Sequence, residues 1–184
     1  MTVLILKAFI LASLFCIDFI QARKIFHINK WQNCRDYTNL AIVLIQHKQH
    51  NYAENNRSTE QIFEVKKHIS GNISGTTTLT KCNLSGAPDT CEFFIKDLKY
   101  SGVCVKMNEK RQAWTPFVES FVPKLACPIK PGTYASKIYF SNASFMRFFP
   151  VPSGIWRARW ILSIENEVIL CQDFEWRVVD VRRS

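Results

Sequence analysis

Two neighbouring stretches of alternating polarity, residues 156–164 and 168–178, constrain the fold of this chain more than any other part of its sequence. Their apolar side chains recur mostly at every second position: Trp156, Ala158, Trp160, Leu162 and Ile164, then Val168, Leu170, Phe174, Trp176 and Val178. Since alternate side chains of a strand point to opposite faces, each stretch predicts a half-buried strand. If Ile164 pairs with Val168 across a turn at 165–167, both apolar stripes lie on one side of a hairpin.

Other segments extend this β pattern. Residues 40–45 form an apolar run typical of a buried strand, 61–69 alternate weakly, 73–81 are rich in Thr, and 134–140 mix aromatic and polar residues. Residues 127–134 read Cys-Pro-Ile-Lys-Pro-Gly-Thr-Tyr, and their two prolines and glycine exclude a helix there. Short strands separated by Asn, Gly and Ser predict an all-β fold, an antiparallel sandwich or cup in a single domain.

Three further segments are predicted not to be strands. Residues 46–59 are polar and rich in Asn and His, which predicts an exposed loop. A short helix is predicted within residues 89–102, because Asp-Thr-Cys-Glu at its start has capping-box spacing and two apolar residues, Phe94 and Leu98, follow four positions apart. A second short helix is predicted at residues 108–113.

Residues 1–22 are predicted to be a secretory signal peptide. Lys7 supplies the positive charge, residues 8–20 form the apolar run, and a small residue ends the segment. A signal anchor is the alternative, but the run is short for a bilayer span and Asp18 interrupts it. The mature domain is therefore predicted to be residues 23–184, secreted and extracellular.

Cysteine usage agrees with that compartment. Removing Cys16 with the signal leaves six of the seven cysteines: Cys34, Cys82, Cys91, Cys104, Cys127 and Cys171. An even number in an oxidising compartment predicts disulfides, although spacing alone leaves their pairing open. Metal ligation is the alternative, but no Cys-x-x-Cys pair occurs, so no metal site is expected. N-glycosylation sequons are present at Asn56, Asn72, Asn83 and Asn142.

The net charge of the chain is +9. A basic secreted protein can favour anionic lipid surfaces or acidic ligands, and the alternative is that the charge only maintains solubility. The basic residues are scattered from Lys24 to Arg183, with no run dense enough for a nucleic-acid groove, so no nucleic-acid partner is expected.

The sequence predicts no catalytic residues and no cofactor. His47 and His50 have the spacing to share a helical face, but neither a third ligand nor a nearby Glu accompanies them. The segment Gly71–Gly75 resembles a nucleophile elbow, yet its Ser is one position too late. All six cysteines of the mature chain can pair, which leaves no thiol nucleophile.

The aromatic stripe of Trp156, Trp160, Phe174 and Trp176 has two interpretations. It can be ordinary core, or it can form the wall of a ligand pocket, since such pockets are lined mainly by apolar and aromatic side chains. Residues 145–152 form a second apolar feature, a loop bounded by two prolines that contains Phe145, Met146, Phe148 and Phe149. An exposed loop of this kind contacts a membrane or partner; a buried one belongs to the core.

The order of several motifs resembles the ganglioside-activator family, and in particular its insect chemosensory CheA/CheB-type branch. The resemblance rests on Trp31-Gln32-Asn33-Cys34, Cys82 with Cys91-Glu92-Phe93, the octet that begins at Cys127, Gly154-Ile155-Trp156-Arg157, and the late Cys171. The resemblance covers most of the mature chain. It implies a β-cup whose two sheets hold lipid chains in a hydrophobic cavity.

The resemblance also implies a disulfide pairing and a binding site. The implied bridges are Cys34–Cys171, Cys82–Cys91 and Cys104–Cys127. The implied cavity wall contains Trp156, Trp160, Phe174 and Trp176, and the implied rim contains Phe145, Met146, Phe148 and Phe149. A fourth disulfide of the vertebrate-type activators is absent, and residues 114–126 carry Phe117 and Phe121 instead.

This departure favours the chemosensory branch. The sequence therefore predicts a secreted protein that binds a hydrophobic or amphipathic ligand, such as a lipid or pheromone, and that contacts a membrane surface or a receptor. One alternative is a lipid-presenting cofactor for a hydrolase. The other is a basic surface-binding protein without a cavity.

Overall fold

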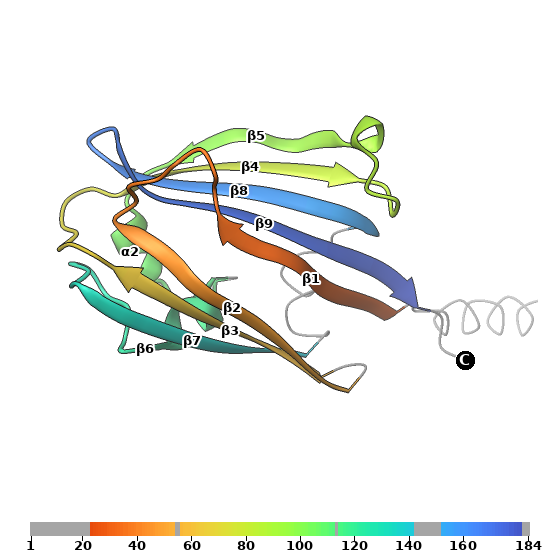
Figure 1. Ribbon diagram of the computed structural model, residues 1–184, viewed down its shortest axis with the longest axis horizontal. Coiled ribbons are helices and arrows are strands. Elements are labelled where there is room, and N and C mark those ends of the chain that lie inside the picture. Colours follow the sequence, from red (N-terminus) through yellow and green to blue (C-terminus); the bar gives the residue numbers. More distant parts are fainter. Residues whose placement is uncertain (1–22, 54–55, 113, 142–151, 182–184) are drawn as a thin grey trace, which may run out of the picture.

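A computed structural model of the chain describes residues 23–53, 56–112, 114–141 and 152–181. Within them, two antiparallel sheets pack face to face as a sandwich (Figure 1). Sheet A has the strand order β1-β9-β8-β4-β5, and sheet B has the order β2-β3-β7-β6. The predicted antiparallel all-β fold is confirmed.

Sheet A consists of β1 (Arg23–Asn33), β4 (Ser74–Cys82), β5 (Glu92–Tyr100), β8 (Gly154–Ile164) and β9 (Glu167–Val181). Sheet B consists of β2 (Ile42–Ala53), β3 (Asn56–Val65), β6 (Phe121–Val122) and β7 (Gly132–Ser141). Three short helical segments lie in the connections: η1 (Pro88–Thr90), α2 (Val103–Met107) and α3 (Thr115–Glu119). No helix among the described residues is long and apolar enough to cross a membrane.

The β8–β9 hairpin forms as predicted, with a different pairing at its turn. Glu165 and Asn166 occupy the turn with positive φ angles of 47° and 71°, which suits the right-handed twist of a hairpin. Ile164 consequently pairs with Glu167 instead of the predicted Val168. A register shift after Leu162 then restores the predicted alignment, so that even residues oppose even residues and both apolar stripes share one side.

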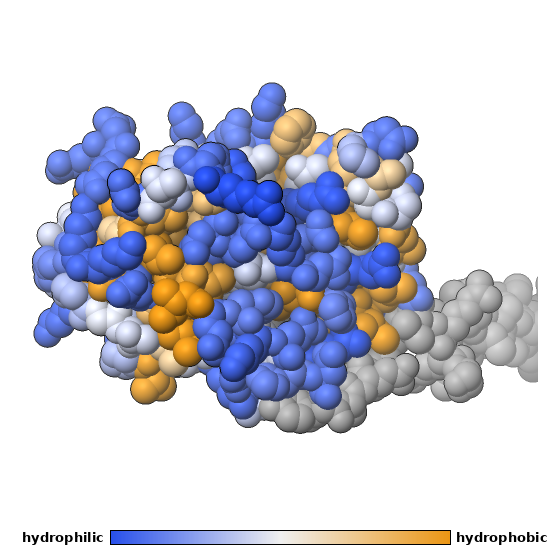
Figure 2. All heavy atoms as spheres, viewed as in Figure 1, coloured by the Kyte–Doolittle hydropathy of each residue, from blue (hydrophilic) through white to orange (hydrophobic). Residues whose placement is uncertain are grey.

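Apolar side chains form two main clusters between the layers. One cluster lies where β2 begins and β3 ends, and it contains Ile42, Leu44, Phe63, Val65 and Ile169, among others. A second lies toward the other end of sheet A and contains Phe26, Ile28, Trp156, Ala158, Trp176 and Val178. Hydrophilic side chains cover most of the face in Figure 2, with apolar patches between them, as expected when the apolar side chains pack between two layers.

Three disulfides join the pairs that the resemblance implied. Cys34–Cys171 links the end of β1 to β9, Cys82–Cys91 closes the loop between β4 and β5, and Cys104–Cys127 links α2 to the segment before β7. Cys34 and Cys171 are buried in a small cluster with Leu40.

Both helix predictions are wrong. Residues 89–102 contain the single turn η1 followed by strand β5, and Asp89 caps nothing with its side chain. The Cys82–Cys91 bridge and the ladder with β4 hold this segment extended, and this tertiary pairing overrides the local helix signal. Of the segment 108–113, the described residues 108–112 lie between two helices, α2 and α3, and form no helix.

The exposed loop predicted at residues 46–59 is also wrong, because most of it lies in β2 and β3. These strands form a hairpin whose register shifts after Leu44 and again after Asn51. The first bulge turns Ile45 outward, where 55% of its surface is exposed, so the run 40–45 is only partly buried. The bulges and polar residues hid the alternation on which the sequence prediction depended.

Candidate ligand-binding site

The candidate site is the inner face of sheet A, where the predicted aromatic residues meet. Trp156 pairs directly with Trp176 across β8 and β9, and Phe174 pairs with Ala158 on the same face. The Trp156 and Trp176 rings stack with centroids 6.1 Å apart, and Phe174 lies 5.0 Å from Trp176 and 6.0 Å from Trp160. We call these four residues the aromatic face.

Two further rings extend the aromatic face. Phe94 of the edge strand β5 contacts Trp156 edge-on at 5.2 Å, and Trp31 of β1 contacts Phe174 at 5.0 Å. Burial differs along this row: Trp156 is fully buried, Trp160 and Phe174 are half-buried, and Phe94 is 60% exposed. The connected rings therefore lead from solvent at β5 into the space between the sheets.

The layer opposite the aromatic face carries polar side chains that the sequence prediction missed. On β3, alternate residues Arg57, Thr59 and Gln61 share the inward face with the core residues Phe63 and Val65. The first three are polar, so the segment had the polarity of an exposed loop. The available signal was the alternation noted from residue 61 onward, continued toward residue 57.

Thr59 is the centre of a buried hydrogen-bond group. Gln61 donates to the Thr59 hydroxyl at 2.5 Å, and a ring nitrogen of His47 lies 2.9 Å from the same oxygen. Thr59 and Gln61 have no exposed surface. Burial lowers the pKa of His47, which favours the neutral imidazole in this position.

Three polar atoms on these inward surfaces have no hydrogen-bond partner among the described residues. They are Nε of Arg57, Oε1 of Gln61 and Nε1 of Trp176. Arg57 uses its Nη1 to donate to the backbone oxygen of Phe26 on sheet A, at 2.9 Å. Buried polar groups are nearly always paired, so these three atoms are open to a further hydrogen-bond partner.

A polar network fixes the two sheets to each other beside the site. The indole nitrogen of Trp31 donates to Gln172 at 3.1 Å, and Gln172 donates to Asn33 at 2.6 Å. Asn33 in turn bonds both backbone groups of Leu44 on sheet B, at 2.8 and 2.9 Å. The spacing between the layers at Trp31 is thus set by directional bonds as well as by packing.

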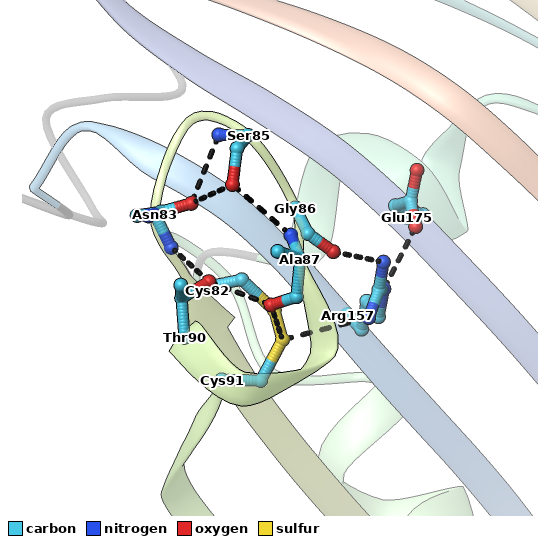
Figure 3. Close-up of a disulfide and its surroundings, with 9 residues drawn as sticks. All are labelled: Cys82, Asn83, Ser85, Gly86, Ala87, Thr90, Cys91, Arg157 and Glu175. Atoms are coloured by element: carbon cyan, nitrogen blue, oxygen red, sulfur yellow. Dashed lines mark hydrogen bonds and ion pairs between the residues drawn. A yellow bond between two sulfur atoms is a disulfide. The ribbon is translucent and has the colours of Figure 1, made fainter.

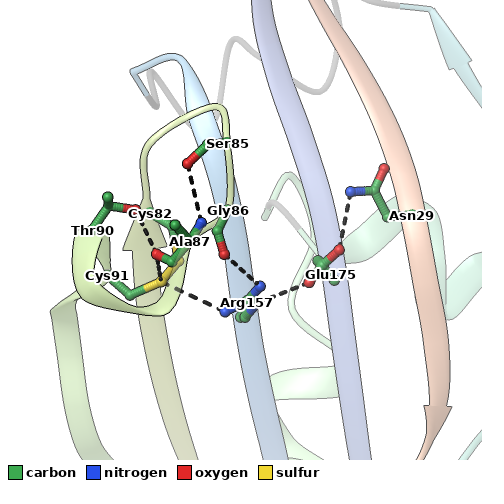
Figure 4. A network of polar contacts seen from close by, with 9 residues as sticks. All are labelled: Asn29, Cys82, Ser85, Gly86, Ala87, Thr90, Cys91, Arg157 and Glu175. Carbon is green, nitrogen blue, oxygen red and sulfur yellow. Dashed lines mark hydrogen bonds and ion pairs between the residues drawn. A yellow bond between two sulfur atoms is a disulfide. The ribbon is translucent and has the colours of Figure 1, made fainter.

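The outer face of sheet A carries the charged side chains of the same strands. Arg157 donates to Glu175 at 2.8 Å and to the Gly86 backbone at 3.3 Å, which fastens the Cys82–Cys91 loop to the sheet (Figure 3). Asn29 adds a bond to Glu175 at 3.1 Å (Figure 4). Burial raises the pKa of Glu175, but these bonds and the Arg157 charge outweigh it, and the net pKa is lowered.

Two surface depressions lie outside the space between the sheets. One, of about 530 Å³, lies beside the disulfide loop and is lined by Lys81, Asn83, Ser85, Thr90, Glu92 and Ser153, among others. The other, of about 310 Å³, lies on the outer face of sheet A and includes Lys30, Thr78, Arg157, Arg159 and Asp173. Each mixes cationic, anionic and neutral groups, so charge alone selects no ligand there.

Several predicted sites have other outcomes. His47 and His50 lie on a strand, three residues apart and on opposite faces, so the shared helical face considered for them is wrong. No group of three metal-ligating side chains occurs among the described residues. Asn72 and Asn83 are exposed, as glycosylation requires. The rim residues Phe145, Met146, Phe148 and Phe149, and Asn142, lie outside the described residues and stay predictions, and glycosylation of Asn56 stays a prediction as well.

Comparison with known proteins leaves the family open. No family model matches the chain, and no curated protein sequence matches it. Among solved structures, a Niemann-Pick type C2 protein from the Japanese carpenter ant is similar, with 10% identity, a TM-score of 0.34, and coverage of 82% of this chain and 96% of that chain. With so low a score, the fold assignment rests on the strand order and disulfides described above. Membership of the chemosensory branch stays a prediction.

Proposed function

We propose that this protein binds a hydrophobic or amphipathic ligand between its sheets, against the aromatic face, and catalyses nothing. The observation that carries this proposal is the connected row of rings from exposed Phe94, through buried Trp156, to half-buried Trp160 and Phe174. A core that serves stability alone gains most by burying all its rings. Half-buried rings inside a sandwich leave apolar surface that a ligand can cover.

The biological role that we propose is secretion followed by chemosensory binding of a lipid or pheromone-like ligand. Signal-like residues 1–22 and three disulfides support an extracellular or luminal compartment. The chemosensory role rests on the sequence resemblance. Expression in sensory hairs would favour it, whereas expression in lysosome-rich tissue would favour a lipid-presenting cofactor for a hydrolase. Binding that collapses as salt rises would favour a surface-binding protein that acts through its charge.

The proposal is tested with N-phenylnaphthylamine, an uncharged probe that fluoresces in apolar pockets. We expect the wild type to bind it and Trp160→Ala to weaken binding roughly tenfold, since aromatic contacts contribute about 0.5–1.5 kcal/mol beyond the area they bury. The melting temperature of the variant is measured in parallel. Half-buried Trp160 should contribute less to stability than the about 3–5 kcal/mol typical of a fully buried Trp.

The matched control is Trp114→Ala, which removes an indole that is 39% exposed and lies outside the sandwich. We expect this variant to bind the probe as the wild type does. A wild type that binds no probe contradicts the proposal. So does a Trp160→Ala variant that melts much lower but keeps the probe affinity, because the aromatic face is then ordinary core.

A further inference from the structure

Arg57 holds a positive charge between the two sheets without a carboxylate partner among the described residues. Its inward position on β3 is fixed by the alternation with Thr59 and Gln61, and within the described part of the chain its side chain donates to the backbone oxygen of Phe26. Its Nε is buried and unpaired. Removing a charge from water is costly unless the charge is paired, so the buried side of this partly exposed guanidinium favours an anionic partner.

The acidic side chains nearby are engaged elsewhere. Glu60 lies on the opposite face of β3, where Lys137 is 2.7 Å and His50 is 3.4 Å from its carboxylate. Asp180, near the end of β9, pairs with Lys24 at 3.3 Å and accepts a hydrogen bond from Ser153. The described residues of the inner faces around Arg57 therefore leave its charge unneutralised.

A second unpaired donor belongs to Trp176, which contacts the same residue, Phe26, that Arg57 contacts. The indole nitrogen of Trp176 is buried without a partner, and 9% of the Trp176 surface is exposed. Phe26 contacts both residues: its backbone oxygen accepts a hydrogen bond from Arg57, and its ring centroid lies 6.1 Å from that of Trp176. Two donors, one of them charged, beside an aromatic surface match a ligand with an anionic end and an apolar chain.

We propose that Arg57 and Trp176 form the head-group site for a single-chain amphiphile with an anionic oxygen head group, a carboxylate or a phosphate monoester. The head group accepts hydrogen bonds from Arg57 Nε and Trp176 Nε1. The apolar chain lies along Trp176, Phe174 and Trp160, whose rings are in continuous contact. This inference rests on the proposed function and adds to it the class of ligand and the direction in which the ligand lies.

The test compares three ligands of equal chain length, tetradecanoate, tetradecyl phosphate and tetradecan-1-ol, as competitors of N-phenylnaphthylamine at neutral pH. We expect one or both anions to displace the probe at a roughly tenfold or more lower concentration than the alcohol, as charged hydrogen bonds allow. The better anion identifies the head group. Arg57→Gln is expected to remove most of that preference while it leaves alcohol and probe affinities within about threefold.

Arg35→Gln is the matched control, since it removes the same charge from an exposed position after β1. We expect it to keep the preference for the anion, which separates a specific contact from the effect of net charge. Arg57→Lys keeps the charge but loses the planar fork, so it should retain part of the preference.

A second measurement avoids mutation altogether. The isotope-labelled carboxyl carbon of tetradecanoate bound to the wild type is titrated by NMR, and we expect its pKa to lie below that of the free acid, because a nearby cation favours the ionised form. A bound pKa at or above the free value overturns the inference. So does a wild type that binds the alcohol as well as both anions, because water then satisfies Arg57. Probe binding without anion preference leaves the proposed function standing; absence of probe binding removes both.

Discussion

Removing the Cys34–Cys171 bridge is expected to cost the most stability of the three disulfides. Its cysteines are 137 positions apart, against 23 for Cys104–Cys127 and 9 for Cys82–Cys91. In the chain-entropy model these spans correspond to about 5, 3.4 and 2.6 kcal/mol of stabilisation, because a longer closed loop restricts the unfolded chain more.

Burial in the native state adds to this ranking. Cys171 has no exposed surface and Cys34 has 2%, so alanines at both positions leave a small cavity next to Leu40. Cys91, by contrast, is half-buried at the surface loop. Since domains of this size are stable by about 5–15 kcal/mol in total, loss of the long bridge removes a large fraction of the stability.

The assay is urea unfolding of the three paired Cys→Ala variants, followed by tryptophan fluorescence, with peptide mapping to verify that the other two bridges remain. We expect the unfolding midpoint to fall most for the Cys34/Cys171 variant and least for the Cys82/Cys91 variant. If removal of the short bridge lowers the unfolding midpoint as much as removal of the long one, chain entropy does not explain the stabilisation. Fastening of the loop by Arg157 would then be the dominant contribution.

Three further outcomes are expected. Replacing Phe148 and Phe149 by Ser should slow uptake of the probe from lipid vesicles and leave the melting temperature nearly unchanged; intracellular retention of the misfolded double variant would mean that the loop is core. Folding lowers the pKa of Glu175, so its stabilising effect is fully present above pH 4.5 and is lost as the pH falls further. The melting temperature of Glu175→Gln should therefore fall less steeply with decreasing pH in the acidic range than that of the wild type. Gly154→Ala should lower the free energy of unfolding by about 1–3 kcal/mol, because φ is +152° and the backbone oxygen of Cys82 lies 2.5 Å from the added Cβ. An unchanged midpoint in urea titrations would contradict this.

The sequence predicts those parts of the fold in which the pattern of polarity matches the pattern of burial. The β8–β9 hairpin was predictable because apolar and charged residues alternate strongly there, and a one-residue slip would turn its three tryptophans outward. Even so, the turn pairing of Ile164 was wrong. The two-residue turn and the bulge after Leu162 have no signature in the polarity pattern.

The polar half of the site could not be predicted in this way. Arg57, Thr59 and Gln61 point inward, and a rule that equates polar with exposed assigns them to a loop. Nor does periodicity distinguish a ring that is fully buried, such as Trp156, from one that is half-buried, such as Trp160. That difference depends on what the facing sheet places opposite each ring.

The shape of β5 has a consequence for how this protein behaves at high concentration. This edge strand exposes 62% of Phe93 and 60% of Phe94, and a flat apolar edge invites pairing with the same strand of another molecule. The register shifts against β4 and the positive φ of 49° at Asp97, which Thr78 holds with a 2.7 Å hydrogen bond, bend the strand. Lys96 adds a charge above the Phe93 ring. A bent, charged edge resists growth into fibrils, so the exposed rings of β5 can stay accessible to a ligand instead of pairing with another copy of the strand.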